Sequence, residues 1–373
     1  MEEERICTRC VMSWPDDPDI TFDENGVCNH CHEYKARAGA ELYYDHMGRL
    51  RLEAIFWQMK LDGEGKAHDC VIGLSGGLDS SFVAYSVVKL GLRPLGVSLD
   101  NGWDTPIAGE NVRNLVRELN IDWEHRSLDP KQFRDLQRSF LKAGVINVEA
   151  PTDHAIGSFL YHRAAQEGLR YIVHGGNIVT EAIMPKAWGY DAKDWRHIKA
   201  IHKKFGSVSL RGFPHMTLWH WVYYTFFKGI KWFPILNYVE YVPDKAKKVL
   251  AEAVGWKDYG GKHLESEWTA FFQRYILPRK FRIDKRKAHL STLINSGFMT
   301  REEALKELEQ APNIFSMIDV QRILRKFGMS LFEFQLYMAA TPVHHAEYVS
   351  NEKWFNRFGG LVKYAKRIAT QGI

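Results

Sequence analysis

Short apolar runs alternate with longer amphipathic segments between residues 70 and 174, and this alternation predicts the fold. Residues 70–74, Cys-Val-Ile-Gly-Leu, form a continuous apolar run that is typical of a buried parallel strand. By the same pattern, further strands are expected at residues 94–100, 123–128 and 171–174. Helical patterns separate them, at residues 82–90, 107–119, 130–143 and 152–167. This alternation predicts an α/β fold with a parallel sheet flanked by helices on both faces.

The second half of the chain departs from this rhythm. Aromatic side chains are frequent in residues 186–245, and after Pro243 the pattern is helical. A helix end is expected at Gly297, and a restart at Thr300-Arg301-Glu302-Glu303, which matches a capping box. We therefore predict an N-terminal module at 1–45, an α/β domain at 46–185, an aromatic-rich insertion at 186–245 and a mostly helical C-terminal region at 246–373.

Composition narrows the class of protein. With 45% hydrophobic and 25% charged residues, the chain of 373 residues is ordinary globular material. A formal net charge of +5 suits a small anionic substrate but does not by itself argue for nucleic acid, and we expect no nucleic-acid partner.

The sequence also bears on location. The aromatic stretch from Met216 to Phe227 is cut short by Lys228 and Lys231, so it falls below the roughly 20 apolar residues that span a bilayer. A buried or subunit-facing helix is expected there instead, and self-association is left open. The acidic start of the chain lacks the pattern of a signal peptide. We therefore expect a cytoplasmic protein without a transmembrane segment.

Four of the five cysteines form two Cys-x-x-Cys pairs, Cys7 with Cys10 and Cys28 with Cys31. In a reducing compartment this spacing predicts a structural zinc site of four thiolates that staples a small zinc-ribbon module. His30 or His32 could replace one thiolate. The fifth cysteine, Cys70, opens a predicted buried strand and is interpreted as a core thiol. No cysteine is then left to act as a glutaminase nucleophile, so any ammonia must come from a separate subunit.

Residues 75–81 read Ser-Gly-Gly-Leu-Asp-Ser-Ser and lie between the first predicted strand and the first helix. Glycines at such a turn let the backbone approach an anion, and the backbone N–H groups, the serine hydroxyls and the helix end converge on a phosphate. Asp79 adds a carboxylate for a phosphate-bound Mg²⁺. No Gly-Lys-Ser/Thr follows the glycines, so the motif differs from a Walker A loop.

This loop resembles that of the ATP pyrophosphatase (PP-loop) family, whose fold is of the adenine nucleotide alpha hydrolase type. The resemblance implies ATP cleavage between the α and β phosphates and adenylation of a carbonyl or carboxylate oxygen. It also implies that Asp100, at the end of the second strand, lies near the adenosine, and that the Gly175-Gly176-Asn177 turn lines the site. A plain tight turn at Gly175-Gly176 is the alternative. The candidate cofactor-binding residues are Ser75, Gly76, Gly77, Leu78, Asp79, Ser80, Ser81, Asp100, Gly175, Gly176 and Asn177.

Two C-terminal segments narrow the resemblance. Residues 260–266 read Gly-Gly-Lys-His-Leu-Glu-Ser, and residues 284–291 read Asp-Lys-Arg-Lys-Ala-His-Leu-Ser. Together with the cysteine module, they resemble the N-acetyl sugar amidotransferases of LPS, O-antigen and pseudaminic- or legionaminic-type surface-sugar pathways. Such enzymes convert an acetamido group of a nucleotide-linked diacetamido sugar, typically an acidic one, into an acetamidino group. Their ammonia comes from partners resembling the glutaminase and cyclase subunits of imidazole glycerol phosphate synthase.

The hypothetical mechanism begins with transfer of AMP to the acetamido oxygen, followed by attack of ammonia. Lys262, Lys285 and Arg286 are expected to stabilise charge as the α–β bond opens, and His263 or Glu265 to direct the ammonia proton. With Asp79, these are the candidate catalytic residues; each of the two proton-transfer candidates could instead be an ordinary helix-face residue.

Two rival interpretations stay open. The first is a tRNA-modifying ATP pyrophosphatase that thiolates or amidates a base. No second Cys-x-x-Cys follows the loop to support it, and the net charge is only mildly basic. The second is a non-catalytic zinc-ribbon scaffold, against which the intact loop with Asp79 argues.

Overall fold

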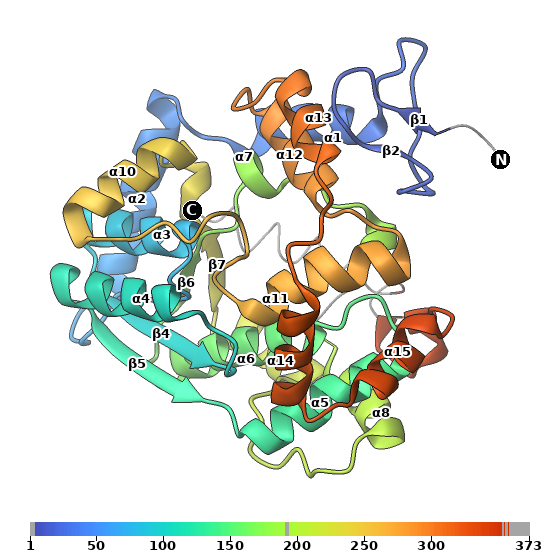
Figure 1. Cartoon of the computed structure of the whole chain (residues 1–373). Helices are drawn as coiled ribbons and strands as arrows, with labels where there is room; N and C mark the ends of the chain where they lie inside the picture. Colours follow the sequence, from blue (N-terminus) through green and yellow to red (C-terminus); the bar gives the residue numbers. More distant parts are fainter. Residues whose placement is uncertain (1–3, 191–193, 353, 355–356, 358–373) are drawn as a thin grey trace.

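The computed structural model describes residues 4–190, 194–352, 354 and 357. Its centre is a five-stranded parallel sheet with the order β5-β4-β3-β6-β7, to the left of centre in Figure 1. The sheet strands are β3 (Cys70–Gly73), β4 (Pro94–Asp100), β5 (Asp122–Ser127), β6 (Tyr171–His174) and β7 (Lys231–Pro234). The α/β fold with a parallel sheet, expected from the apolar runs, is confirmed.

Helices cover both faces of the sheet because successive strand residues point to opposite sides. On one face, Cys70 and Ile72 of β3 pack with α2 (His46–Asp62), α3 (Leu78–Lys89), α4 (Pro106–Leu119) and α10 (Pro243–Val254). On the other face, Val71 packs with α6 (Ala150–Gln166) and with Trp221. Cys70 is fully buried in this core, which confirms that it is a core thiol.

The sheet has one strand more than the pattern predicted. β7 begins at Lys231, inside the segment interpreted as an aromatic-rich insertion, and pairs with β6 in parallel from Tyr171–Lys231 to His174–Pro234. Its four residues, Lys-Trp-Phe-Pro, include a lysine and a proline, which are uncommon in strands, so the pattern did not predict a strand here. Proline is tolerated here because β7 lies at the edge of the sheet, where one side of the strand needs no ladder hydrogen bonds.

The aromatic stretch before β7 is helical, as expected, but it is only partly buried; a subunit-facing role for it stays a prediction. It forms α9 (Leu218–Val222), which continues as the π-helical η2 (Tyr223–Phe227). Trp221 is buried, whereas Trp219 and Phe227 are exposed. Among the described residues, no helix is long and apolar enough to cross a membrane.

The described residues after α10 are mostly helical, as predicted. Thr300 caps α13 through a complete capping box with Glu303, and this confirms the predicted restart. The helices after α10 are α11 (Glu267–Phe271), the π-helical η4 (Phe272–Phe281), α12 (Arg286–Asn295), α13 (Arg301–Glu309), α14 (Met317–Phe327) and α15 (Leu331–Ala339). A second large core joins α11, η4, α12, α14 and α15 to α5 (Pro130–Ala143) and α8 (Trp195–Phe205), whereas α13 packs against α12 in a smaller cluster.

The remaining elements are short or lie near the N-terminus. The N-terminal module contains the antiparallel pair β1 (Arg5–Ile6) and β2 (Ser13–Trp14), followed by α1 (Asn29–Glu41). After β6, the short helix α7 (Ile178–Glu181) enters the middle of the molecule, where it contacts α1 and α12 (Figure 1). The short helices η1 (Lys186–Trp188), η3 (Ile235–Asn237) and η5 (His345–Glu347) complete the described elements.

Lys280 lies in the basic segment before α12. It is buried, and its side chain caps the C-terminal end of α15. Its ammonium group donates hydrogen bonds to the carbonyl oxygens of Tyr337 (2.6 Å) and Ala340 (2.5 Å). Burial lowers the pKa of Lys280, so these two carbonyls supply the partners that a buried cation requires.

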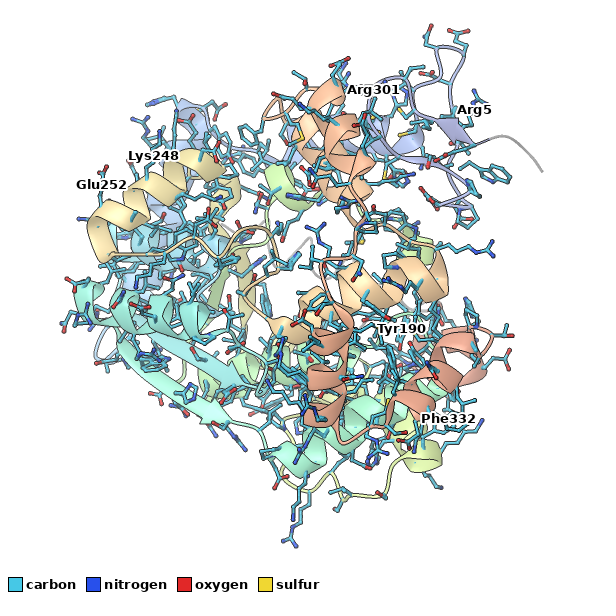
Figure 2. The ribbon with its side chains drawn as sticks, in the orientation of Figure 1. Arg5, Tyr190, Lys248, Glu252, Arg301 and Phe332 are labelled. Atoms are coloured by element: carbon cyan, nitrogen blue, oxygen red, sulfur yellow. The ribbon has the colours of Figure 1, made fainter. Side chains whose placement is uncertain are left out.

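We predict that Lys280→Met lowers the free energy of unfolding by about 1–3 kcal/mol, because both carbonyl groups lose their donor. Denaturant unfolding of the full chain measures the change. Lys248→Met is the matched control, since Lys248 is exposed on α10 (Figure 2) and its removal should change stability by less than about 0.5 kcal/mol. Equal losses in the two variants would contradict this account of Lys280.

Candidate active site and metal centre

The phosphate-type loop lies at the carboxyl end of β3, where ligands bind in parallel sheets. Gly77 is the N-cap of α3, so Asp79, Ser80 and Ser81 belong to the first turn of the helix and not to the loop before it. The first N–H groups of a helix have no intrahelical acceptor and carry partial positive charge. The loop therefore offers backbone donors beside the hydroxyls of Ser75 and Ser80, whose Oγ atoms lie 3.0 Å apart.

Two glycines of the predicted set lie so close to neighbouring segments that a side chain would crowd them. Gly76 has φ +75°, and a Cβ built on it would lie 2.2 Å from the carbonyl oxygen of Ala108. A Cβ on Gly175 would lie 3.0 Å from the Cβ of Asp79. The Gly175-Gly176 turn is therefore packed directly against the first turn of α3, as a site-lining turn must be.

Asp79 is the centre of a polar network. Its carboxylate accepts hydrogen bonds from the hydroxyl of Tyr241 and from Lys262 Nζ, the latter at 3.3 Å. Lys262 also lies 2.9 Å from Glu181 and donates to Thr180 Oγ1 at 3.1 Å. Burial opposes the charge of Lys262, but Asp79 and Glu181 outweigh it and raise its pKa. Lys262 is thus a fixed cation opposite the loop.

A cavity of about 1000 Å³ opens around this network. Its walls come from the loop, from α7 and from the chain between α10 and α13. The sequence-predicted residues that line it are Ser75, Gly77, Leu78, Asp79, Ser80, Gly175, Gly176, Lys262, His263, Glu265, Lys285 and Arg286. Residues separated by more than two hundred positions in the chain are therefore brought to one place.

The segment before α11 covers the loop. Tyr259 accepts a hydrogen bond from the backbone N–H of Leu78 at 3.1 Å. The next residues turn sharply: Gly260 has φ +92° and His263 has φ +63°. A left-handed conformation is uncommon for a residue other than glycine, asparagine or aspartate, and such residues often occur at functional sites. His263 Nδ1 lies 4.0 Å from Glu265.

The local environment shifts the pKa of each proton-transfer candidate. Burial, with the charge of Asp79, raises the pKa of Glu265 to about 7, and Glu265 Oε2 finds no partner among the described residues. Burial and the nearby Lys285 and Lys262 hold the pKa of His263 well below its usual value. Burial likewise lowers the pKa of His289 to about 4. At neutral pH both imidazoles are neutral, and Glu265 is poised near its titration point.

The basic segment before α12 is mostly engaged in structural contacts. Arg286 forms a bidentate pair with Asp284 and donates to the carbonyl oxygens of Glu307 and Gln310. It lines the cavity, but these contacts occupy its guanidinium group. Lys285 is different: its charge acts on His263 and on two carboxyl groups of the α6 N-terminus, Glu149 and Asp153.

Glu149 and Asp153 form a second acidic group beside Lys285. Asp153 is exposed at one side. The protein that surrounds the rest of it disfavours its charge, and together with the charge of Glu149 this raises its pKa to about 7. Glu149 is held in place by a hydrogen bond from Thr269 Oγ1 (2.6 Å), far along the chain.

Four predicted residues lie away from the cavity wall. Asp100 accepts from Gly102 N (2.6 Å) in the loop after β4 and from Ser127 Oγ (3.3 Å) at the end of the neighbouring strand β5. Asn177 caps α7 by accepting from Thr180 N at 2.8 Å. Gly76 and Ser81 are both buried and do not line the cavity; Ser81 is fully buried. Conversely, the pattern gave no indication of Tyr241, Thr180 or Glu181; His289 stood in a motif that we quoted but did not assign.

The chain resembles known proteins in its C-terminal part. Residues 265–361 match the family model described as "LPS biosynthesis protein WbpG-like, C-terminal domain". By this similarity we refer to residues 265–361 as the WbpG-like domain. The domain begins at Glu265 and supplies Lys285, Arg286 and His289 to the cavity, whose other wall is the phosphate-type loop. A search of curated proteins found no match.

Two solved structures are similar to this chain at low scores. The NMN synthetase from Francisella tularensis shares 16% identity and a TM-score of 0.34, covering 79% of this chain and 98% of its own. The NH3-dependent NAD synthetase from Campylobacter jejuni, in complex with the nitrate ion, shares 16% identity and a TM-score of 0.30, covering 57% and 94%.

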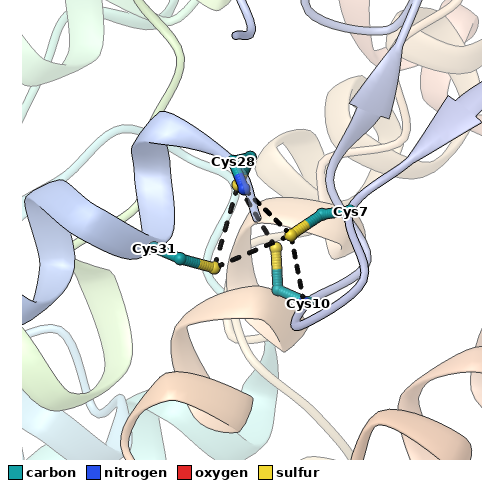
Figure 3. Close-up of side chains that lie close together, drawn as sticks. All are labelled: Cys7, Cys10, Cys28 and Cys31. Carbon is teal, nitrogen blue, oxygen red and sulfur yellow. Dashed lines mark hydrogen bonds between the residues drawn. The ribbon is translucent and has the colours of Figure 1, made fainter. Parts of the chain in front are cut away.

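The four cysteines of the N-terminal module converge on one point (Figure 3). All four Sγ atoms lie within 4.8 Å of one another, with Cys10–Cys28 at 3.7 Å and Cys28–Cys31 at 3.8 Å. Tetrahedral zinc with Zn–S bonds of about 2.3 Å requires S···S separations of about 3.8 Å. Backbone N–H groups of Arg9, Cys10 and Cys28 point at Cys7 Sγ. The donor set therefore fits a zinc ion.

Neither histidine of the module competes with the cysteines. His30 pairs with Asp17 at 2.7 Å, and His32 pairs with Asp23 at 2.9 Å. Of the alternatives that the sequence left open, the four-thiolate site is therefore the one that this geometry favours.

The module is docked on the WbpG-like domain. Asn295 of α12 donates to Cys31 Sγ at 3.3 Å, and Arg301 of α13, labelled in Figure 2, donates to the carbonyl oxygens of Cys7 and Cys10. Lys287 reaches Asp16 and Glu4 in the module. The helix α12, which follows Lys285 and presents His289 to the cavity, is thereby held by the cysteine module.

We predict that Cys28→Ser lowers the bound zinc from about one ion per chain and lowers the melting temperature, since a staple of the module is lost. Elemental analysis and thermal unfolding measure the two quantities. The control is Cys70→Ala, which should retain zinc because Cys70 lies in the sheet core. Unchanged zinc content in Cys28→Ser would exclude the four-cysteine site.

We also predict that Glu265 makes stability depend on pH. Its pKa is higher in the folded chain, so its stabilising contribution is complete below about pH 4.5 and declines as pH rises through about 7. Relative to Glu265→Gln, the wild-type melting temperature should therefore fall between these pH values. Glu252→Gln, an exposed change on α10 (Figure 2), should run parallel to wild type. A parallel profile for Glu265→Gln would show that the pKa of Glu265 is not raised.

Proposed function

We propose that the chain is an AMP-forming, ATP-dependent amidotransferase of LPS biosynthesis. One observation carries the proposal: the phosphate-type loop and the polar residues of the WbpG-like domain line the same cavity. A cavity of about 1000 Å³ is large enough for a nucleotide and a second, sugar-sized molecule.

The loop is the proposed pyrophosphate site. Ser75, Ser80 and the first-turn N–H groups of α3 would hold the β and γ phosphates, and Lys262 would neutralise charge that develops as the α–β bond opens. Asp79 would hold a Mg²⁺ ion, which screens the phosphate charge when bound. Asp79 already faces Lys262 and Tyr241, so its carboxylate is oriented before a ligand arrives.

The proposed acceptor is an acetamido group of a nucleotide-linked diacetamido sugar, typically a uronate. Its carbonyl oxygen attacks the α-phosphorus, pyrophosphate leaves, and an O-adenylyl imidate results. Ammonia then attacks the imidate carbon, AMP departs with the oxygen, and an amidine remains after loss of a proton. In surface-polysaccharide assembly, such as that of O-antigen, this reaction would take place in the cytoplasm.

The site supports the proton transfers that this route requires. A carboxyl group with a pKa near 7 can accept a proton from the attacking ammonia at neutral pH, and Glu265 meets this condition. His263 and His289 remain neutral, so they add no cation that would repel an ammonium ion.

We propose that another protein supplies the ammonia. Burial raises the pKa of the Cys70 thiol, and the other four cysteines form the zinc-type cluster. No cysteine of this chain is thus available as a glutaminase nucleophile. We propose a glutaminase subunit with a cyclase-like subunit, of the kind that forms imidazole glycerol phosphate synthase, as the partners.

We predict that Asp79→Asn lowers pyrophosphate release at least about 100-fold in the presence of ATP, Mg²⁺, ammonium and a nucleotide-linked diacetamido sugar. The amide keeps the size of the side chain but loses the charge that binds the metal and orients Lys262. Pyrophosphate detection and chromatography of AMP and ADP measure the result.

Glu252→Gln serves as the activity control, and zinc content with thermal unfolding verifies the fold of Asp79→Asn. Accumulation of ADP by the wild-type chain would refute AMP transfer. Normal pyrophosphate release by Asp79→Asn would refute the role given to the loop.

A further inference from the structure

The helix α9 and its continuation η2 expose a row of aromatic side chains. Trp219 is 79% exposed and Phe227 is 78% exposed, and Tyr223 lies between them at intervals of four residues. We call Trp219, Tyr223 and Phe227 the aromatic stripe. Tyr223 and Phe227 stack with their ring centroids 6.1 Å apart, so the outer part of the stripe is continuous. Large apolar side chains gathered in this way on a surface mark an interaction site.

The opposite side of this helix is firmly anchored. Trp221 belongs to the core beneath the sheet, and the hydroxyl of Tyr224 lies 2.8 Å from His162 Nδ1 on α6. The rings of Tyr161 and Tyr224 are stacked as well. Since Trp221 and Tyr224 already secure the helix, the exposed rings of the stripe are not needed to hold the fold together.

The surrounding sequence is basic. From Trp195 to Val239 it contains no Asp or Glu, while Lys228 and Lys231 directly follow the stripe. The ammonium group of Lys228 lies 5.8 Å from the centre of the Tyr223 ring. The nearby carboxylate of Asp62 is paired with Arg170 at 3.4 Å. The stripe therefore ends in cations.

Charge decides which occupant fits. In a two-fold dimer the same patch meets itself, so Lys228 of one copy would approach the cations of the other. Aromatic rings that end in lysines instead match the interface of an anionic bilayer, where Trp and Tyr sit at headgroup level and lysines meet negative lipid.

We propose that the aromatic stripe with Lys228 and Lys231 docks the chain on an anionic membrane surface. The helix lies in the plane of the interface, with Trp219 and Phe227 inserted among the headgroups and Lys228 paired with lipid phosphates. This contact is independent of the reaction in the cavity.

Cosedimentation of the full, zinc-loaded chain with vesicles tests the proposal. One vesicle type contains equal parts of phosphatidylglycerol and phosphatidylcholine, and the other contains phosphatidylcholine alone. We expect at least tenfold tighter binding to the anionic vesicles, weakened by added salt. Trp219→Ser with Phe227→Ser should reduce this binding at least tenfold, and Lys228→Glu should remove most of the preference for anionic lipid.

The matched control removes two exposed apolar residues from α15, Phe332 (67% exposed; Figure 2) and Leu336 (56%), as Phe332→Ser with Leu336→Ser. It should bind vesicles as wild type does. The proposal is overturned if wild type fails to bind anionic vesicles, or if the stripe and control variants bind equally. It is also overturned if the stripe variant turns a dimer into a monomer in sedimentation velocity without changing vesicle binding, since the face would then join two copies.

Discussion

The ion pair between Asp79 and Lys262 is the contact on which the arrangement of the site depends. It connects the first turn of α3 to the segment that leads into the WbpG-like domain. Both side chains are only partly exposed, at 20% and 24%, so removing one partner leaves the other charge poorly compensated. Tyr241, Thr180 and Glu181 complete the network, so four separate stretches of chain are held around one carboxylate and one ammonium group.

Charged side chains also need partners of opposite charge on α12, and this requirement links the cysteine module to the cavity. α12 faces the cavity with His289 and faces the module with Asn295. Lys287, between them, pairs with carboxylates of the module, whereas Lys285 stays directed at the cavity. Adjacent cations thus have different partners: Lys287 contacts the module, Arg286 contacts the end of α13, and Lys285 lines the cavity. A metal at the cysteines would stiffen the helix that positions these groups.

Charge also distinguishes the two surfaces that we assign to ligands. In the cavity, cations and carboxylates alternate, and the pKa values of Glu265 and the two histidines respond to this mixture. Around the aromatic stripe, acidic residues are absent from the local sequence, and the carboxylate of Asp62, which acts on Lys231, is paired with Arg170. A mixed site suits chemistry with proton transfer, and a one-sign surface with aromatic rings suits adhesion.

The sequence by itself determined the features that rest on neighbours in the chain. Apolar runs predicted β3 to β6, Gly-Gly and Asp79 predicted the loop at the end of β3, the Cys-x-x-Cys spacing predicted the thiol cluster, and Thr300 with Glu303 predicted a capping box. Only the tertiary structure decided that β7 completes the sheet, that Arg286 donates to the carbonyl oxygens of Glu307 and Gln310, and that Tyr241 and His289 meet Asp79 and Lys262 in one cavity. The reason is physical: a strand at an edge and a partner across the cavity are chosen by packing and charge between distant segments, which leave no periodic trace in the local sequence.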